Sequence, residues 1–177
     1  MRKVVLLLIT IMSIGFEGSA QVKYDTCQNI HQFEGEWVYA NGSDTIRVFL
    51  RHTRYLVSDF NSIDDVLFGW HEYKQGNTVV ESTYPNRFMS LANPDKITKR
   101  SFSIGLMMGE LDCNANIKRA SGSIRDYLQG NETKIVTITL DATGTVMTWR
   151  QRHSEGYGVF TGATGMTLPK EFVLIKQ

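Results

Sequence analysis

The chain has 177 residues, of which 42% are hydrophobic and 21% are charged, and its formal net charge at pH 7 is +1. Nearly equal numbers of acidic and basic residues argue against a nucleic-acid or anionic-membrane partner, because both attract proteins with a strong positive charge. The length is enough for one domain with its own hydrophobic core.

The first twenty residues form an apolar leader. Arg2 and Lys3 precede an apolar run at Val4–Ile14, and Gly18-Ser19-Ala20 supplies the small residues of a cleavage site. This order is typical of a secretory signal peptide. The run is shorter than the ~20 residues that span a bilayer, so an N-terminal anchor or a buried helix is the weaker reading. We expect residues 1–20 to be removed and residues 21–177 to form a single exported domain.

The remaining chain has two cysteines, Cys27 and Cys113, so only one disulfide is possible within it. An oxidising compartment favours such a bridge. Two separate buried thiols are the alternative, because the sequence does not show whether the two Cα atoms lie close enough for a bond.

The first expected hairpin runs from Trp37–Ala40 to Thr45–Arg51, through the turn dipeptide Asn41-Gly42. Apolar and polar residues alternate along the return strand, except that Phe49 interrupts the polar face. Alternation with period two is the pattern of a strand with one buried face. Asn-Gly is typical of a tight hairpin turn, because both positions tolerate a positive φ angle.

A second hairpin is expected from Val66–Lys74 to Thr78–Thr83. Asp64 and Asp65, directly before it, are interpreted as a turn or a helix cap. The stretch Tyr84–Lys99 contains two prolines and predicts a short helix or a long loop.

Later strands are expected at five ranges, and the glycine-rich segment Gly156–Thr167 predicts a loop. The five ranges are Ser101–Asp112, Ile117–Leu128, Lys134–Leu140, Thr145–Arg152 and Glu171–Lys176. The chain therefore predicts about eight to ten strands and no major helix. Because sequential hairpins avoid exposed edges by closing on themselves, we expect an all-β, antiparallel up-and-down β-barrel. A two-sheet sandwich is the alternative.

Gly35-Glu36-Trp37, at the start of the first strand, resembles the Gly-x-Trp opening of lipocalins and related calycin barrels. In those proteins the Trp closes one end of the barrel, and a basic residue from a late strand packs across it. The resemblance implies that Gly35 and Trp37 are barrel-closing residues. It implies a basic partner for Trp37 among Arg150, Arg152 and Lys176.

A longer pattern combines the leader with Phe33–Tyr39, Asn41–Thr45, Gly69–Tyr73 and Leu168–Gln177. It resembles a domain-of-unknown-function family of small exported β-proteins from Gram-negative bacteria. The resemblance covers most of the chain after the leader. It implies a lipocalin-like barrel located in the periplasm, on the outer cell surface or outside the cell. It implies no activity.

Arg125 and Tyr127 are two residues apart, so on a strand their side chains point the same way. The pair resembles the Arg-x-Tyr pair with which fatty-acid-binding barrels hold a carboxylate, because a guanidinium offers a planar fork to two oxygens. A solvent-facing pair is the alternative.

Aromatic residues are the second group of candidate ligand-binding residues. The five that could line an apolar cavity are Trp70, Tyr73, Trp149, Tyr157 and Phe160. Core packing is the alternative, because a barrel of about eight strands is either filled by side chains or holds one small ligand.

The four histidines, His31, His52, His71 and His153, are too dispersed for the spacing of a metal site. His52 and His71 lie on neighbouring expected hairpins, so they could still meet. We expect no metal, no cofactor and no enzymatic activity, because no arrangement of nucleophile, base and carboxylate stands out.

The sequence therefore predicts a non-enzymatic binder of a small, mostly apolar molecule. The alternative is an interaction or structural protein of the cell envelope that acts through surface loops such as Gly156–Gly165. A third class, an enzyme, would need a cluster of titratable side chains in a cleft. Neither a nucleic acid nor a membrane span is expected, and the sequence names no protein partner.

Overall fold

The computed structural model describes residues 23–24, 28–57, 62–91, 102–108, 118–128, 130, 132–153 and 167–177. Several predictions concern residues outside these ranges: the leader at 1–20, Cys27, Cys113, Tyr157, Phe160 and almost all of the expected loop at 156–167. They stay predictions.

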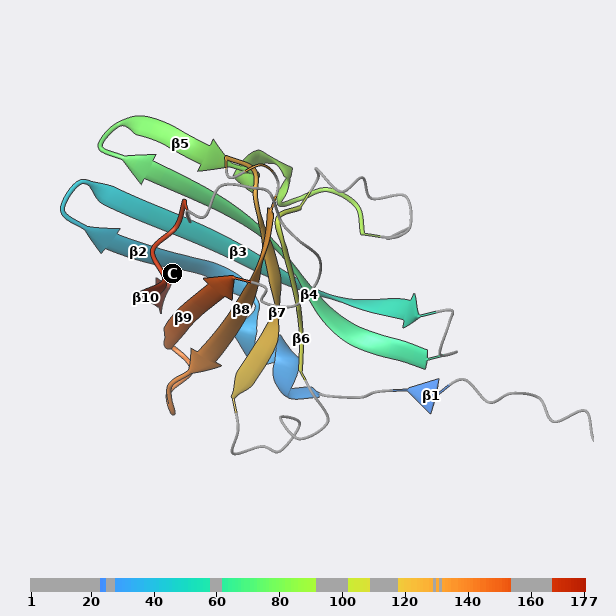
Figure 1. Cartoon of the computed structure of the whole chain (residues 1–177). Helices are drawn as coiled ribbons and strands as arrows, with labels where there is room; N and C mark the ends of the chain where they lie inside the picture. The colour runs from blue at the N-terminus through green and yellow to red at the C-terminus, as the bar shows by residue number, and fades with distance from the viewer. Residues whose placement is uncertain are drawn as a thin grey trace, which may run out of the picture.

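Eight strands form a closed antiparallel ring, visible in Figure 1. Their bounds are β2 (Gly35–Asn41), β3 (Asp44–Val57), β4 (Ser62–Gln75), β6 (Ile104–Met107), β7 (Arg119–Asp126), β8 (Glu132–Leu140), β9 (Val146–His153) and β10 (Glu171–Lys176). Each ring strand pairs with the next ring strand along the chain, β4 with β6 included, and β10 pairs back to β2. The predicted up-and-down β-barrel is confirmed.

Strand β4 pairs with β3 over its whole length on one edge. Its other edge is shared by β1 (Lys23–Tyr24), β6 and β5 (Thr78–Ser82). The β3–β4 hairpin is longer than the sequence predicts and extends past the ring (Figure 1).

The turn or helix cap expected at Asp64 and Asp65 is wrong, because both residues lie within β4 and pair with Tyr55 and Arg54. A contact made by the Asp65 side chain explains why this segment forms a strand and not a turn. The carboxylate bonds to His52 across the hairpin, and this tertiary contact outweighs the preference of aspartate for turns.

Two tight turns follow the sequence prediction closely. Gly42 and Gly76 both adopt φ of 59°, in the β2–β3 and β4–β5 turns. Side chains other than glycine pay a steric penalty at such angles, so these residues fix the hairpins where the sequence places them.

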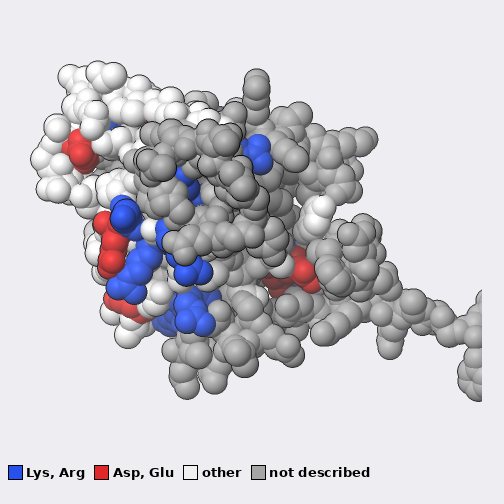
Figure 2. Space-filling model, viewed as in Figure 1, with Lys and Arg blue, Asp and Glu red and all other residues white. Residues whose placement is uncertain are grey.

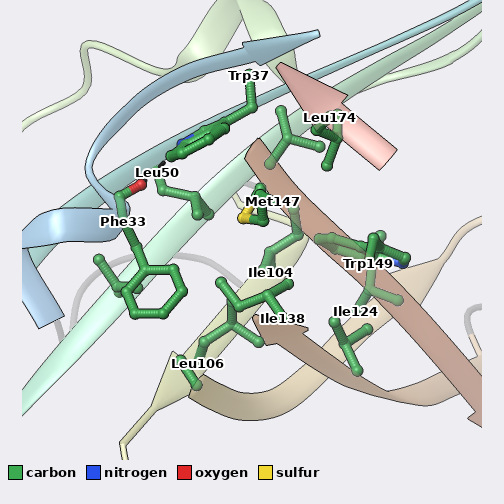
Figure 3. Close-up of a cluster of buried hydrophobic side chains, with 14 of the residues drawn as sticks. Phe33, Trp37, Leu50, Ile104, Leu106, Ile124, Ile138, Met147, Trp149 and Leu174 are labelled. Atoms are coloured by element: carbon green, nitrogen blue, oxygen red, sulfur yellow. Dashed lines mark hydrogen bonds between the residues drawn. The ribbon is translucent and has the colours of Figure 1, made fainter. Parts of the chain in front are cut away.

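A short 3-10 helix, η1 (Gln28–Phe33), precedes β2 and lies at one end of the barrel, which we call the η1 end. The opposite end, where β7 turns into β8, is called the distal end. The interior of the η1 half is filled by apolar side chains (Figure 3). Gly69 belongs to this packing: a Cβ there would lie 2.7 Å from Leu50 Cδ2 and 2.8 Å from Ile104 Cβ.

A second apolar cluster, the outer cluster, covers the outside of β3 and β4. It contains Val66, Phe68, Trp70 and Leu91, with Phe49, Tyr55, Met89 and Phe102 packed against them. The segment from η3 (Tyr84–Asn86) to Leu91 lies over this face, and Arg51 Nη1 donates to the carbonyl oxygens of Arg87 and Met89 at 3.0 and 2.8 Å. Phe49 therefore interrupts the polar face because this segment covers it.

Charged side chains of both signs lie intermixed on the face seen in Figure 2, on the side of β9 and β10. Arg150 on β9 pairs with Glu171 on β10 at 3.0 Å, and both side chains are more than half exposed. Among the described residues, no helix has the length and apolar character needed to cross a membrane.

Candidate binding site at the distal end of the barrel

The distal half of the interior contains buried polar side chains. His71, Glu81, Asp126, Lys134 and Gln151 are all less than 9% exposed. The ring strands β4, β7, β8 and β9 place His71, Asp126, Lys134 and Gln151 inward, because successive side chains alternate between the two faces of a strand. Glu81 lies on β5 and pairs with Tyr73 of β4. Lys134, for example, shares its face of β8 with the core residues Val136, Ile138 and Leu140.

His71 is the centre of a small hydrogen-bonded group. Its Nδ1 lies 2.7 Å from Ser103 Oγ, which in turn lies 3.0 Å from Thr83 Oγ1. The backbone N of His71 donates to Thr83 Oγ1 at 3.2 Å. These contacts join β4 to the residues that follow β5 and precede β6. They hold the imidazole in one orientation.

The other nitrogen of this ring, Nε2, has no hydrogen-bond partner among the described residues, although His71 is fully buried. Glu81 lies beside this nitrogen, but its Oε2 is 3.7 Å away, too far for a hydrogen bond. Glu81 Oε1 accepts from the backbone N of Tyr127 at 2.9 Å. An unsatisfied buried nitrogen costs about 1–3 kcal/mol, so Nε2 marks a place where a further polar group would be favourable.

Serine, histidine and glutamate are also the residue types of a catalytic triad. A nucleophile, however, has to reach its substrate, and Ser103 is only 4% exposed. The 3.7 Å gap leaves the His71 ring without the orienting carboxylate bond of a triad. Among the described residues, these three side chains therefore do not have the geometry of a catalytic triad.

The segment 167–170 is tied to the distal half by two buried polar residues. Asp126 accepts from Thr167 N at 2.8 Å and from Thr167 Oγ1 at 2.6 Å. Gln151 Nε2 donates to the carbonyl oxygens of Leu168 and Pro169 at 2.8 and 3.1 Å. These two side chains therefore position backbone at this end of the barrel.

Arg125 and Tyr127 lie on the outside of the barrel. Arg125 lines a pocket of about 80 Å³ over outward-facing positions of β6, β7 and β8, together with Phe102, Ser103, Gly105, Ser123 and Thr133. Tyr127 donates its hydroxyl to the carbonyl oxygen of Phe102 at 3.1 Å. The pocket is smaller than the ~150 Å³ cavity that holds benzene, so a fatty acid would not fit in it.

Trp70 and Trp149 lie in different parts of the molecule and do not line a common cavity. Trp70 belongs to the outer cluster, whereas Trp149 faces the interior and stacks on Phe172 with ring centroids 5.6 Å apart. Trp70 is one residue away from His71, so the alternation of β4 points it to the other face. Of the three aromatic candidates that the structure describes, Tyr73 and Trp149 face the interior and Trp70 does not.

The η1 end has the geometry that the Gly-x-Trp resemblance implies. Trp37 is fully buried, and its Nε1 donates to the carbonyl oxygen of Phe33 at 2.8 Å (Figure 3). Lys176 Nζ lies 5.2 Å from the centroid of the Trp37 ring, so the basic residue is Lys176 and neither Arg150 nor Arg152. Gly35 adopts φ of +114°, and a Cβ there would lie 3.5 Å from Lys176 Cε.

A model of a protein family, described as "Family of unknown function (DUF6705)", matches residues 1–177. The chain belongs to this family. No curated protein and no solved structure matches this chain.

In this DUF6705 member, the buried polar side chains of the distal half were not predicted from the sequence pattern. One signal was visible: Lys134 begins the alternation that continues with Val136, Ile138 and Leu140, which places it on the buried face. His71 gave no such signal, because β4 is buried on both faces around it. His52 and His71 do not meet, since His52 pairs with Leu67 and His71 with Val48 along the β3–β4 ladder.

Proposed function

We propose that this protein is an exported, lipocalin-like binding protein without enzymatic activity, and that it holds a small molecule in the distal half of its barrel. The unsatisfied Nε2 of His71 carries the proposal. The η1 half offers little room, because side chains fill it. A ligand would therefore lie toward the distal end.

The lipocalin-like part of the proposal is supported by the η1 end. Trp37 is fully buried at this end of the barrel, and Lys176 from the last strand packs across its indole ring. These are the features that the Gly-x-Trp resemblance implies. Export is supported by the leader, which has the order of a signal peptide.

The surroundings of His71 indicate the class of ligand. Aromatic rings of Tyr39, Tyr73 and Phe172 lie in the same half as the buried polar residues. A molecule with an apolar body and at least one hydrogen-bonding group would match both. Either tautomer of His71 leaves Nε2 with one bond to make, so the polar group could be a hydroxyl, a carbonyl or a carboxyl.

The first test is native mass spectrometry of the full chain after expression in a bacterium with a periplasm. A mass above that of the denatured protein would identify a bound molecule. The matched variants are His71→Leu, which removes the nitrogen, and Ser121→Ala, on the outward face of β7, where Ser121 Oγ lies 3.3 Å from Thr137 Oγ1. We expect the extra mass to persist in Ser121→Ala and to disappear in His71→Leu.

A bare mass in the wild-type protein, or an extra mass that persists in His71→Leu, would contradict the proposal and favour action through the outer surface. The denatured spectrum answers two further points. Loss of residues 1–20 would support export. A mass ~2 Da below that of the reduced protein would show that Cys27 and Cys113 are bridged.

A further inference from the structure

Two histidines that are far apart in the sequence meet at the η1 end. His31 lies in η1 and His52 lies on β3, and their ring centroids are 4.0 Å apart. Glu34 is the third member of the group: its Oε2 lies 3.0 Å from His31 Nδ1, and its Oε1 accepts from the backbone N of His52 at 2.8 Å. One ligand atom from each of these three side chains lies within 4.8 Å of the other two.

Local structure explains why the three side chains converge. A 3-10 turn has three residues per turn, so residues i and i+3 lie on the same side of it. The backbone N of Glu34 donates to the carbonyl oxygen of His31 at 3.2 Å, and this bond closes such a turn. His52 continues the inward-facing series of Ile46, Val48 and Leu50 on β3, so its side chain lies at the η1 end of the barrel.

Asp65 holds the His52 ring in place from the neighbouring strand β4. Its Oδ1 lies 2.6 Å from His52 Nε2, and Arg54 Nε lies 3.5 Å from the same oxygen. A carboxylate bound to one nitrogen of an imidazole fixes the ring and raises its basicity, which is the usual environment of a metal-binding histidine.

The carboxylate of Glu34 lies between the two histidines. Its Oε2 lies 3.0 Å from His31 Nδ1 and its Oε1 accepts from the backbone N of His52 at 2.8 Å. It can therefore offer an oxygen to an ion that both imidazoles bind.

We propose that His31, Glu34 and His52 form a binding site for a divalent transition metal at the η1 end of the barrel, with zinc as the best match. Two imidazole nitrogens and one carboxylate oxygen are a known zinc ligand set, in which a fourth position stays open for water or another ligand. Calcium and magnesium prefer oxygen ligands, so they fit the set poorly.

The exposure of the side chains is compatible with metal entry. His31 and Glu34 are 51% and 39% exposed, so both can rotate from their present contacts toward an ion. Zinc lies about 2.0–2.2 Å from such ligands, and a small contraction of the group would reach this distance. Binding would connect η1 to the β3–β4 hairpin at the end of the barrel that Trp37 closes.

The test is calorimetric titration of zinc into the untagged full-length protein after chelator treatment. We expect one zinc per chain. His31→Ala and Glu34→Gln should each weaken binding about tenfold or more, and Asp65→Asn should weaken it about 10–100-fold. Glu171→Gln, which removes an exposed carboxylate at the start of β10 that pairs with Arg150, should leave binding unchanged.

Two controls separate metal binding from folding. Glu34→Gln retains an oxygen that can accept from His52 N, and His31 lies on the surface, so both variants should keep the wild-type unfolding curve in the absence of metal. Cobalt substitution should give the intense visible absorption of a four-coordinate ion. The proposal is overturned if folded wild-type protein shows no saturable binding up to 100 µM zinc, or if binding survives both substitutions.

Discussion

Leu67 and His71 lie four residues apart on β4 and face the same interior, yet they have very different neighbours. Leu67 belongs to the apolar packing of the η1 half, whereas His71 contacts Ser103 and lies near Glu81. The η1 half thus has the composition of a stabilising core. The distal half instead contains buried polar side chains, and among the described residues Nε2 of His71 is left unsatisfied there. An unsatisfied buried group costs free energy, and such a cost is typical of a site with a function.

The largest change in stability is expected from a substitution in the η1 half. Leu67→Ala should lower the free energy of unfolding by about 2–5 kcal/mol, because it removes buried methyl groups and leaves a cavity. Chemical denaturation followed by tryptophan fluorescence measures this change. Val173→Ala, on the outward face of β10 where Val173 is 46% exposed, should change stability by no more than about 0.5 kcal/mol. Equal effects at the two positions would contradict the description of this half as the stabilising core.

The next largest change in stability is expected at the η1 end, where Lys176 covers Trp37. Lys176→Met retains most of the volume of the side chain, but it removes the cation over Trp37 and the hydrogen bond from Nζ to the carbonyl oxygen of Gln32. We expect a loss of about 1 kcal/mol. Thermal unfolding of Lys176→Met beside Lys170→Met, a change at an exposed lysine, measures it. If the two variants melted together, Lys176 would have no closing role.

A smaller stability effect, with a larger functional one, is expected in the distal half. His71→Leu removes the unsatisfied Nε2, and Ser103 keeps its contact with Thr83. Stability should therefore change by less than about 1 kcal/mol. The same variant should lose the molecule detected by native mass spectrometry. A loss of stability as large as that of Leu67→Ala would mean that His71 is part of the structural core and that the two halves do not differ.

The smallest change in stability is expected at Asp141, in the exposed turn between β8 and β9. A hydrogen bond from Thr143, with further bonds from the backbone of Val146, Thr143 and Thr145, lowers the pKa of Asp141 to about 2 from the ordinary 3.8. Because the folded-state pKa is below the unfolded value, the stabilising contribution is complete above the ordinary pKa. It is lost as the pH falls from about 4 to about 2.

Asp141→Asn should remove this acid dependence and leave the rest of the pH profile unchanged. Unfolding midpoints measured at pH 2, 3, 4 and 7 in the wild type and the variant provide the comparison. An unchanged slope between pH 4 and 2 would show that the turn carboxylate does not contribute to acid stability.

Much of the barrel could be predicted because its signals are local. Alternating apolar residues and the turn glycines Gly42 and Gly76 set the strands and their order, and the ring follows from joining neighbours. The long β3–β4 hairpin was missed because its outer part carries polar residues on both faces, which erases the period-two pattern.

The candidate sites were predicted less well, because they depend on which face a strand presents and on contacts between distant residues. Arg125 and Tyr127 are two residues apart, as the strand pattern requires, but the pattern does not reveal that their face is the outer one. Trp70 and Trp149 are both buried aromatic residues, and only the packing shows that one of them lies outside the barrel wall.

The sequence by itself determined the alternating strands of the barrel, the tight turns and the Gly-x-Trp opening, since each of these depends on residues close together in the chain. Membership of the family follows from the sequence along the whole chain. The tertiary structure alone decided that Lys176 covers Trp37 and that His31 meets His52. It also decided that Nε2 of His71 is buried with no hydrogen-bond partner in the part of the chain that the structure describes. The physical reason is that closing a sheet into a barrel fixes strand tilt and register together, and these bring distant residues to the same height on the same face.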